Sequence, residues 1–252
     1  MINPLVSCLC VTYGRPVLLG EAIKCFIDQN YPNKELIVLN DQVGVELYMD
    51  NCPDSVKIIN HPTRFNSLGE KRNYSKSIGN GEFFCVWDDD DLYTPYRISD
   101  SVRLMQQNPN YDIIKAREAF MSVDNKNYKV VSNVFHSQAI ISKKYMTQNQ
   151  YPFKSIGEDT DFEKNANIGS RVMFPSFWYI YRWGLGIHHV SGIEGEKKSW
   201  QKSLTFAPYQ IKGRIEVKAE FKNNYWADIS REFEKINPQW RKEWEKKIKD
   251  CS

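Results

Sequence analysis

Apolar runs alternate with helically spaced apolar residues along the first half of the chain. The runs at 5–11, 35–39 and 83–87 have the length and character of strands buried on both faces of a sheet. Between the first two, apolar residues recur at 18, 19, 22, 23, 26 and 27, which is helical spacing. The same patterns predict helices at 68–78 and from Pro95 to Gln107, and strands at 56–59 and 111–114. This alternation predicts a mostly parallel α/β sheet with helices on both faces.

The pattern changes after residue 114. Two β-like segments flank 124–127 and predict an antiparallel hairpin, and Gly157 precedes a short helix. Further strands are expected at 171–174 and 177–182, whereas 42–55 is expected to be irregular. From about residue 209 the chain is rich in mixed charge and is expected to be helical. We therefore expect an α/β domain over 1–205 and a charged helical extension over 206–252 packed on it.

Four consecutive carboxylates, Asp88 to Asp91, follow directly after the apolar run at 83–87. Adjacent aspartates repel one another, and removing them from water beside a core strand is costly. A divalent cation removes both costs, and carboxylate oxygens are ligands that Mg²⁺ and Mn²⁺ prefer. In an extended chain Asp88 and Asp90 point to the same side. Asp88-x-Asp90 is thus a candidate metal site at the carboxyl end of a strand, where open α/β sheets bind ligands.

The acidic run has a second interpretation without a metal. It can be a solvated turn before the next helix, with Thr94 as the N-cap and Pro95 at the first helical position. An EF-hand is not supported, because neither Asp88 nor Asp89 starts the required D-x-[DN]-x-[DN]-G pattern.

Composition narrows the class of protein only moderately. The 252 residues are 41% hydrophobic and 13% aromatic, which is enough for a substantial core. The net charge of +3 is too small to indicate nucleic acid by itself, and no apolar run approaches membrane-spanning length. The first basic residue is Arg15, so a signal peptide is not expected. The six cysteines form no C-x-x-C pair, which favours reduced thiols in a cytoplasmic protein.

Five motifs, taken in order, resemble those of family 2 glycosyltransferases with the GT-A fold. The resemblance covers about residues 5–190. It rests on the opening V-T-Y-G-R-P, the segment Q-N-Y-P-N-K-E-L-I-V-L-N-D, the helix start G-E-K-R-N, the acidic W-D-D-D-D and the later G-E-D. Lys71, in G-E-K-R-N, replaces the small residue usual in the family. Each motif alone is weak, and only the D-x-D and E-D pieces are specific to chemistry.

The resemblance implies inverting transfer of a sugar, most simply from a UDP-sugar, to an acceptor hydroxyl. Asp90, and Asp88 directly or through water, would hold Mn²⁺ or Mg²⁺, with His188 or His189 as a further ligand. Asp159 would act as the general base and Glu158 would orient the acceptor or the motif. Asp41 would hydrogen-bond the uracil ring. The implied nucleotide-sugar contacts are Thr12, Tyr13, Arg15, Asp41, Gly69, Arg72, Asn73, Asp88 and Asp89.

Plainer interpretations stay open for these residues. Asp41 can simply end a strand, Arg72 can be a surface helix residue, and Glu158 and Asp159 can be acids favoured at a helix start. The histidine pair can be solvated.

Other functions also stay open, namely a sugar nucleotidyltransferase, a phosphatase, or a non-catalytic relic that binds sugar nucleotides. A phosphatase of the haloacid-dehalogenase type needs its D-x-D at the first strand, and a relic would be expected to have lost Asp90 or Asp159. The favoured acceptor is a glycan, while a lipid, a protein or a nucleic acid stays open.

Overall fold

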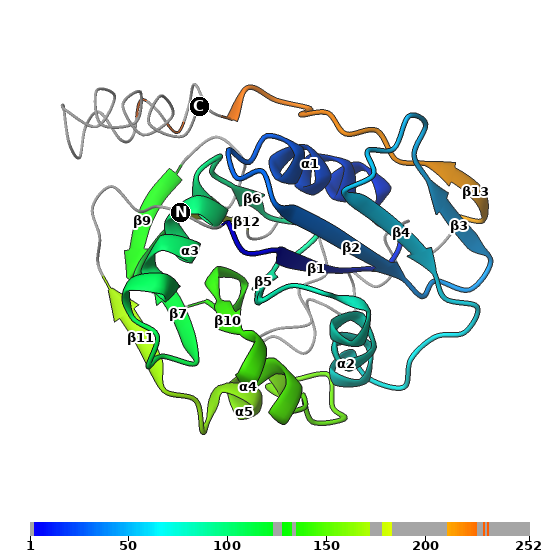
Figure 1. Cartoon of the computed structure of the whole chain (residues 1–252). Helices are drawn as coiled ribbons and strands as arrows, with labels where there is room; N and C mark the ends of the chain where they lie inside the picture. Colours follow the sequence, from blue (N-terminus) through cyan, green and yellow to red (C-terminus); the bar gives the residue numbers. More distant parts are fainter. Residues whose placement is uncertain are drawn as a thin grey trace.

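A seven-stranded sheet lies at the centre of the computed structural model, which describes residues 3–122, 128–132, 135–171, 178–182, 211–225, 229 and 231 (Figure 1). Strand β10 runs antiparallel to both of its neighbours, and the other pairings are parallel. The mixed, mostly parallel sheet expected from the sequence is confirmed. In order across the sheet the strands are β11 (Ile168–Arg171), β7 (Ile113–Ala116), β10 (Ile140–Ser142), β5 (Phe83–Val86), β1 (Val6–Thr12), β2 (Lys34–Asn40) and β4 (Val56–Asn60).

Alternating side chains divide the core into two layers, one on each face of this sheet. In β1, Cys8 and Cys10 pack into the layer that contains α1 and α3, whereas Leu9 packs with α4 and α5 on the other face. Both layers are apolar, which explains why the central strands are continuous hydrophobic runs rather than alternating patterns. The helices are α1 (Pro16–Ile27), α2 (Leu68–Ile78), α3 (Arg97–Gln107), α4 (Lys143–Gln148) and α5 (Glu158–Glu163), with a 3₁₀ turn, η1 (His136–Gln138).

A second, four-stranded sheet has the order β6-β12-β8-β9. Its hairpin confirms the expected antiparallel pair, because Glu118 lies opposite Ser132 and Ser122 opposite Tyr128. Residues 123–127 of the turn lie outside the described residues. The strands are β6 (Leu92–Tyr93), β8 (Glu118–Ser122), β9 (Tyr128–Ser132) and β12 (Tyr179–Arg182).

Two expectations about irregular and helical segments are wrong. The stretch at 42–55 contains β3 (Val45–Tyr48), and the region expected to be helical after about 209 contains β13 (Gly213–Glu216). These two strands pair in parallel at one edge of the molecule (Figure 1). Each is short and alternates polar with apolar residues, and their pairing is non-local. Helix appears in this part of the chain at Tyr225, and most residues beyond it lie outside the described set.

The start of α3 also differs from the expectation. Its N-cap is Tyr96 and makes no side-chain cap, so Thr94 and Pro95 do not begin the helix. The side chain of Gln29, two residues after the end of α1, instead binds the backbone at this helix start. Its amide nitrogen donates to the Thr94 carbonyl at 2.6 Å, and its amide oxygen accepts from the Ile98 N–H at 3.0 Å. A side chain far away in sequence thus satisfies one of the donors that every helix start leaves open.

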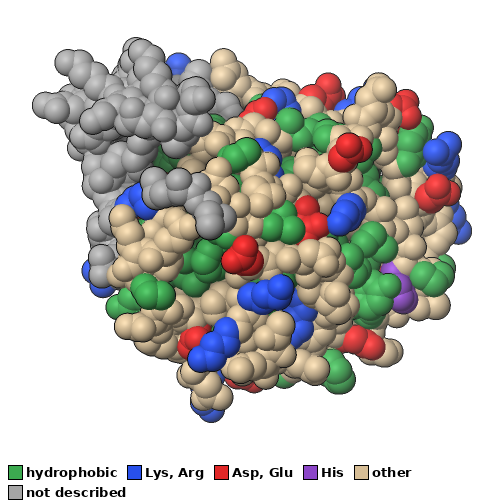
Figure 2. Space-filling model, viewed as in Figure 1, with side chains coloured by type: hydrophobic (Ala, Val, Ile, Leu, Met, Phe, Trp, Pro, Cys, Tyr) green, Lys and Arg blue, Asp and Glu red, His purple; other side chains and the backbone are tan. Residues whose placement is uncertain are grey.

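The cysteines that the structure describes form no disulfide with one another. Cys8, Cys10, Cys25 and Cys85 are buried and free, and Cys52 is free and exposed. On the face shown in Figure 2, Lys and Arg side chains are interspersed with Asp and Glu among the described residues. None of the described helices has both the length and the apolar character needed to cross a membrane.

Candidate active site

The predicted site residues come together at the carboxyl ends of the parallel strands. Strand β1 ends at Thr12, β2 ends at Asn40 just before Asp41, and β5 ends two residues before Asp88. Because β2, β1 and β5 are neighbours running in the same direction, these ends share one edge of the sheet. Open α/β sheets bind their ligands at this edge.

The acidic loop (Asp88–Asp91) divides its carboxylates among different partners because the chain turns at Asp89 and Asp90. Asp89 accepts hydrogen bonds from Thr12 Oγ1 at 2.5 Å and from Arg15 Nε at 3.2 Å. Arg15 Nη1 lies 2.6 Å from Asp90 Oδ2. The expected extended chain, with Asp88 and Asp90 on one side, is therefore wrong, and Asp90 is grouped with Asp89 around Arg15.

The outer members of the acidic loop are held from other elements. Asp88 accepts a hydrogen bond from Ser137 Oγ in η1, and its Oδ1 lies 3.6 Å from Arg72 Nη2. Asp91 accepts from the Tyr179 hydroxyl at 2.5 Å and from the Arg182 backbone N–H at 2.8 Å. Asp89, Asp90 and Asp91 are each at most 5% exposed, so the alternative of a solvated turn is wrong.

Burial makes the charge of this loop expensive. It raises the pKa of Asp89 to about 6, although Arg15 works in the opposite direction. Burial, followed by the charges of Asp90 and Asp88, raises the pKa of Asp91 well above its usual range. Arg15 is itself buried, which opposes its charge, but the facing aspartates raise its pKa above the ordinary value. The loop therefore holds more negative charge than its environment stabilises, which favours an added cation.

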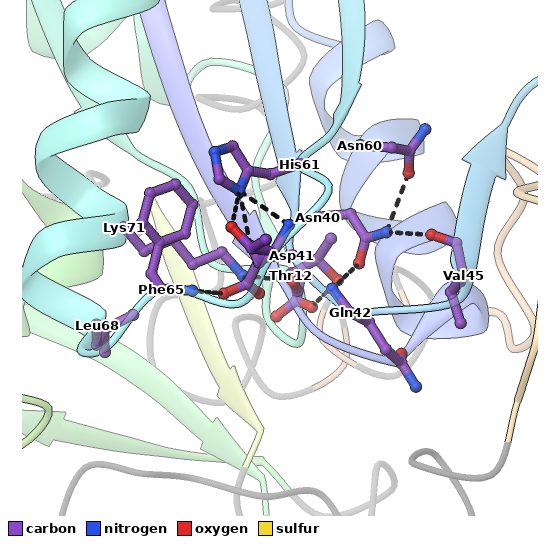
Figure 3. A network of polar contacts seen from close by, with 12 residues as sticks. Thr12, Asn40, Asp41, Gln42, Val45, Asn60, His61, Phe65, Leu68 and Lys71 are labelled. Carbon is purple, nitrogen blue, oxygen red and sulfur yellow. Dashed lines mark hydrogen bonds and ion pairs between the residues drawn. The ribbon is translucent and has the colours of Figure 1, made fainter.

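At the end of β2, Asp41 forms a buried ion pair with Lys71 of α2 (Figure 3). Lys71 Nζ lies 2.5 Å from Asp41 Oδ1 and donates to the Thr12 carbonyl at 2.6 Å. The other carboxylate oxygen, Oδ2, accepts from the Phe65 backbone N–H at 3.1 Å. Burial lowers the pKa of Lys71, while the charge of Asp41 opposes that shift. Asp41 is therefore more than the residue that follows a strand, because it has a buried ion-pair partner in Lys71.

The turn that carries Asp41 is fixed by the residue before it. Asn40 Nδ2 donates to the Val45 carbonyl and to Asn60 Oδ1, each at 3.0 Å, and Asn40 Oδ1 accepts from the Gln42 N–H at 3.1 Å (Figure 3). Strands β2, β3 and β4 are thereby joined at the point where Asp41 leaves the sheet. A side chain held in this way is suited to positioning a ligand, because little conformational freedom is left to lose on binding.

Arg72 connects the acidic loop to Glu158, the first of the two acids at the start of α5. Its Nε lies 3.3 Å from Glu158 Oε1, and its Nη2 faces Asp88. Burial raises the pKa of Glu158, with Arg72 offsetting part of the rise. Burial also opposes ionisation of Asp159, but His136 and the Thr160 N–H, 2.7 Å from Asp159 Oδ1, lower its pKa overall. Of the two acids, Asp159 has the lowered pKa and Glu158 the raised one. Arg72 is paired with Glu158 and largely buried, so it is not the surface residue of the plainer interpretation.

Gly69 and Asn73 contact the loop before α5 rather than the acidic loop. The Gly69 N–H donates to the Lys154 carbonyl at 3.0 Å, and a Cβ on Gly69 would lie 1.9 Å from the Pro152 carbonyl oxygen. Asn73 exchanges hydrogen bonds with the Tyr151 backbone at 2.8 and 2.9 Å. In the described residues, both therefore position the segment that leads into Glu158 and Asp159.

A buried polar cluster behind α5 has no motif in the sequence. His136 Nδ1 lies 2.5 Å from Glu163 Oε1, and His136 Nε2 lies 3.0 Å from the Tyr151 hydroxyl. Lys115 of β7 pairs with the other oxygen of Glu163. Arg72 lies over the Tyr151 ring, 5.9 Å from its centroid. Sequence reasoning missed these residues because they converge from β7, η1 and α5 only in the folded chain.

A second missed cluster joins the acidic loop to the segment after β13. Arg182 Nε donates to the Asp90 carbonyl at 2.6 Å, and Arg182 Nη1 lies 2.5 Å from Glu21 Oε2 in α1. Glu21 Oε1 accepts from the Tyr225 hydroxyl at 2.7 Å and from the Lys222 N–H at 3.0 Å. Arg182 and Glu21 are fully buried. The acidic loop, the first helix and residues 222–225 are thus one polar network.

The donor set of the acidic loop fits a hard divalent cation that is completed by a ligand. Among the described residues, no three His, Cys, Asp or Glu side chains form a complete metal site. Mg²⁺ is commonly held by one or two carboxylates, with water and substrate phosphates as the remaining ligands. The raised pKa values of Asp89 and Asp91 favour a cation at this loop, and its ligation by Asp88 and Asp90 stays a prediction. His188 and His189 lie outside the described residues, so their role as ligands stays a prediction.

Known proteins resemble this chain in both sequence and fold. MJ1057 of Methanocaldococcus jannaschii, named an uncharacterized glycosyltransferase, is 23% identical over 90% of this chain and 84% of its own length. RT0329 of Rickettsia typhi, named likewise, is 30% identical over 44% of this chain, and the match spans 35% of the relative.

Solved structures share the GT-A fold with this chain. The crystal structure of residues 1–349 of S. aureus TarS with UDP has a TM-score of 0.54 and 18% identity, over 71% of this chain and 60% of that one. The mannosyltransferase PcManGT from Pyrobaculum calidifontis, in complex with GDP-Man and Mn²⁺, has a TM-score of 0.53 and 12% identity, over 81% and 61%. The sequence model described as glycosyl transferase family 2 matches residues 7–203, and the chain belongs to that family.

Proposed function

We propose that this chain transfers a sugar from a nucleoside-diphosphate sugar, most simply a UDP-sugar, to an acceptor hydroxyl with inversion at the anomeric carbon. The observation that carries the proposal is the position of the buried acidic loop at the carboxyl edge of the sheet, with Asp41 at the end of β2 and the α5 acids linked to the loop through Arg72. A donor's base, its diphosphate and the acceptor each have a chemically matching group there. Family membership supports sugar transfer over phosphate hydrolysis.

On the donor side, the ends of β1, β2 and β5 would bind the nucleotide. Asp41 would accept a hydrogen bond from the base, while Thr12, Tyr13 and Arg15 would line the nucleotide beside the acidic loop. Arg72 would sit between the diphosphate and the acceptor side. Asp88 and Asp90 would hold Mn²⁺ or Mg²⁺, which when bound would neutralise the departing diphosphate. TarS was solved with UDP and UDP-GlcNAc and PcManGT with GDP-Man and Mn²⁺, which supports a nucleotide-sugar donor here.

On the acceptor side, Asp159 would take the proton from the attacking hydroxyl. Its carboxylate is ionised at neutral pH and can accept a proton, while the lowered pKa makes it a weaker base than an ordinary aspartate. Glu158 is paired with Arg72 and is more buried, so it would orient the acceptor or α5 rather than accept the proton. Attack from the face opposite the leaving group would invert the anomeric centre.

A glycan is the acceptor class that we favour. Nucleic acid binding relies on a continuous basic surface that neutralises phosphates. On the described part of the face in Figure 2, basic and acidic side chains are mixed instead. This face lacks a continuous basic patch in its described part, which favours a neutral glycan over a nucleic acid.

The test combines binding with product analysis. Calorimetry should show that UDP binds with Mn²⁺ present and loses affinity in EDTA. In Asp90→Asn the affinity with Mn²⁺ should fall by about tenfold or more, roughly 1.4 kcal/mol, toward the EDTA value. Equal affinity in Mn²⁺ and EDTA would refute the metal assignment. Incubation with nucleotide sugars and acceptor should release UDP. A sugar nucleotidyltransferase would instead release pyrophosphate, from UTP and a sugar 1-phosphate, and a phosphatase would release inorganic phosphate from a phosphate monoester. Binding of UDP without turnover of any nucleotide sugar would indicate a non-catalytic protein that binds sugar nucleotides.

A further inference from the structure

The ion pair of Asp41 and Lys71 is a single buried unit. The two side chains are 5% and 6% exposed, and the amine and carboxylate atoms are 2.5 Å apart. Burying either charge alone is far more costly than burying both together. The conformation of Asp41 is therefore set by Lys71 on one oxygen and by the Phe65 N–H on the other (Figure 3).

This unit retains hydrogen-bonding capacity for a ligand. An ammonium group has three hydrogens, and the described contacts of Lys71 occupy two of them, on Thr12 and Asp41. A carboxylate has about four acceptor positions, and the described contacts of Asp41 occupy two. What remains is a carboxylate acceptor directly beside an ammonium donor.

A stacked pair of Tyr13 and Arg64 lies on the chain segments next to this unit. Tyr13 follows Thr12, whose carbonyl receives Lys71, and the Arg64 guanidinium lies 4.1 Å from the centroid of the Tyr13 ring. Arg64 precedes Phe65, whose N–H binds Asp41. Tyr13 and Arg64 therefore belong to the two chain segments whose backbone groups hold Lys71 and Asp41.

Resting on the proposed function, we infer that Lys71 and Asp41 together select the base of the donor, by binding a ring N–H that is flanked by a ring carbonyl. The N–H donates to Asp41 and the carbonyl accepts from Lys71. Uracil presents this pattern at N3–H with O2 or O4, and guanine presents it at N1–H with O6. Cytosine and adenine present a ring nitrogen lone pair beside an amino group, which faces the carboxylate with the wrong polarity. Lys71 is thus a specificity-determining residue.

The first experiment uses the unmodified protein, with Mn²⁺ constant in every titration. Calorimetry with UDP, GDP, CDP and ADP should show UDP or GDP bound roughly ten- to hundredfold more tightly than CDP and ADP, the range of a charge-assisted hydrogen bond. The UDP and GDP titrations distinguish the two bases that share the pattern. UDP methylated at N3 should lose affinity by a similar factor, because it cannot donate to Asp41.

The second experiment separates Lys71 from a general structural effect. Lys71→Met keeps the length of the side chain and removes its charge, and it should lower the ratio of UDP to CDP affinity by about tenfold. UDP with sulfur in place of O2 or O4 should bind less tightly than UDP to the wild type, and the difference should vanish in Lys71→Met. Lys71→Arg is the matched control, which retains the charge and should keep most of the preference.

The outcomes distinguish this inference from the proposed function. If the wild type binds none of the four nucleotides, the proposed function fails and this inference fails with it. If UDP binds but the wild type does not discriminate against CDP or the N3-methylated nucleotide, only the inferred selection of the base by Asp41 and Lys71 is overturned. Equal losses for UDP and CDP in Lys71→Met would show that Lys71 is structural alone. These wild-type arms decide the matter even if Lys71→Met does not fold.

Discussion

Two buried charge clusters occupy the same edge of the central sheet, and they are built in opposite ways. At the end of β2 one carboxylate meets one ammonium group, Asp41 with Lys71. After β5 the four carboxylates of the acidic loop meet, among the described residues, the guanidinium groups of Arg15 and Arg72. The first cluster is balanced and the second is acidic in excess, as the raised pKa values of Asp89 and Asp91 indicate. A balanced pair suits a neutral base, whereas an acidic excess suits a ligand that arrives with a cation.

The largest expected effect is on the transfer rate and comes from Asp159, which lies outside both clusters. It tests whether proton transfer is separate from the donor binding that we propose for the two clusters. Asp159→Asn keeps shape but cannot accept a proton, so the transfer rate should fall by about 10²–10⁴ while UDP and Mn²⁺ binding stay near wild type. Initial rates and calorimetry on the same preparation measure both. Glu158→Gln is the neighbouring control and should lose less. A near wild-type rate, or a product that retains the donor's anomeric configuration, would contradict the mechanism.

The next effect is on stability, and it sharpens the contrast between the clusters. Asp41→Ala leaves Lys71 buried without its partner, which should lower the free energy of unfolding by about 3–5 kcal/mol. Combining it with Lys71→Met should restore most of that loss. UDP binding to Asp41→Ala should weaken by roughly 1.5–3 kcal/mol. Urea denaturation and calorimetry measure the two quantities. An unfolding midpoint unchanged from wild type would mean that the pair is not the unit described here.

The smallest effect is a dependence of stability on pH. Here the loss of a carboxylate stabilises the protein, whereas in Asp41→Ala it destabilises the protein. Because the pKa of Asp89 is raised from 3.8 to about 6 in the folded protein, its ionisation costs stability as the pH rises from about 4 to about 6. Asp89→Asn does not ionise. In EDTA, its unfolding free energy relative to wild type should therefore shift in its favour by up to about 3 kcal/mol over that interval and then stay constant. A difference in unfolding free energy that does not change with pH would show that the pKa of Asp89 is not raised in the folded protein.

The sequence predicts the parts of this molecule that depend on local pattern. Strands β1, β2 and β5 are continuous apolar runs, and the helix at 68–78 has its expected bounds. The acidic loop, Asp41 and the acids of α5 were each found within short motifs. Strands β3 and β13 were missed because each becomes a strand only by pairing with the other across most of the chain.

The partners of the site residues could not be predicted for the same reason. Lys71 was visible only as a departure from a family pattern, and its ion pair depends on how α2 lies over the end of β2. His136 follows the β8–β9 hairpin with no motif around it, and it meets Glu163 and Tyr151 only after β10, α4 and α5 have packed. Motifs thus identify groups that carry chemistry, whereas the groups that tune them are set by tertiary structure.

The network of Arg182, Glu21 and Tyr225 bears on where this polypeptide can be shortened. A shortened chain that ends before residue 222 lacks the N–H of Lys222 and the hydroxyl of Tyr225, which both donate hydrogen bonds to Glu21. Arg182 also holds the Asp90 carbonyl, so loosening Glu21 loosens the backbone of a residue that we propose as a metal ligand. Residues 211–225 therefore cannot be trimmed as a dispensable tail, and because Ile229 is also buried in the core, an engineered boundary or fusion belongs beyond it.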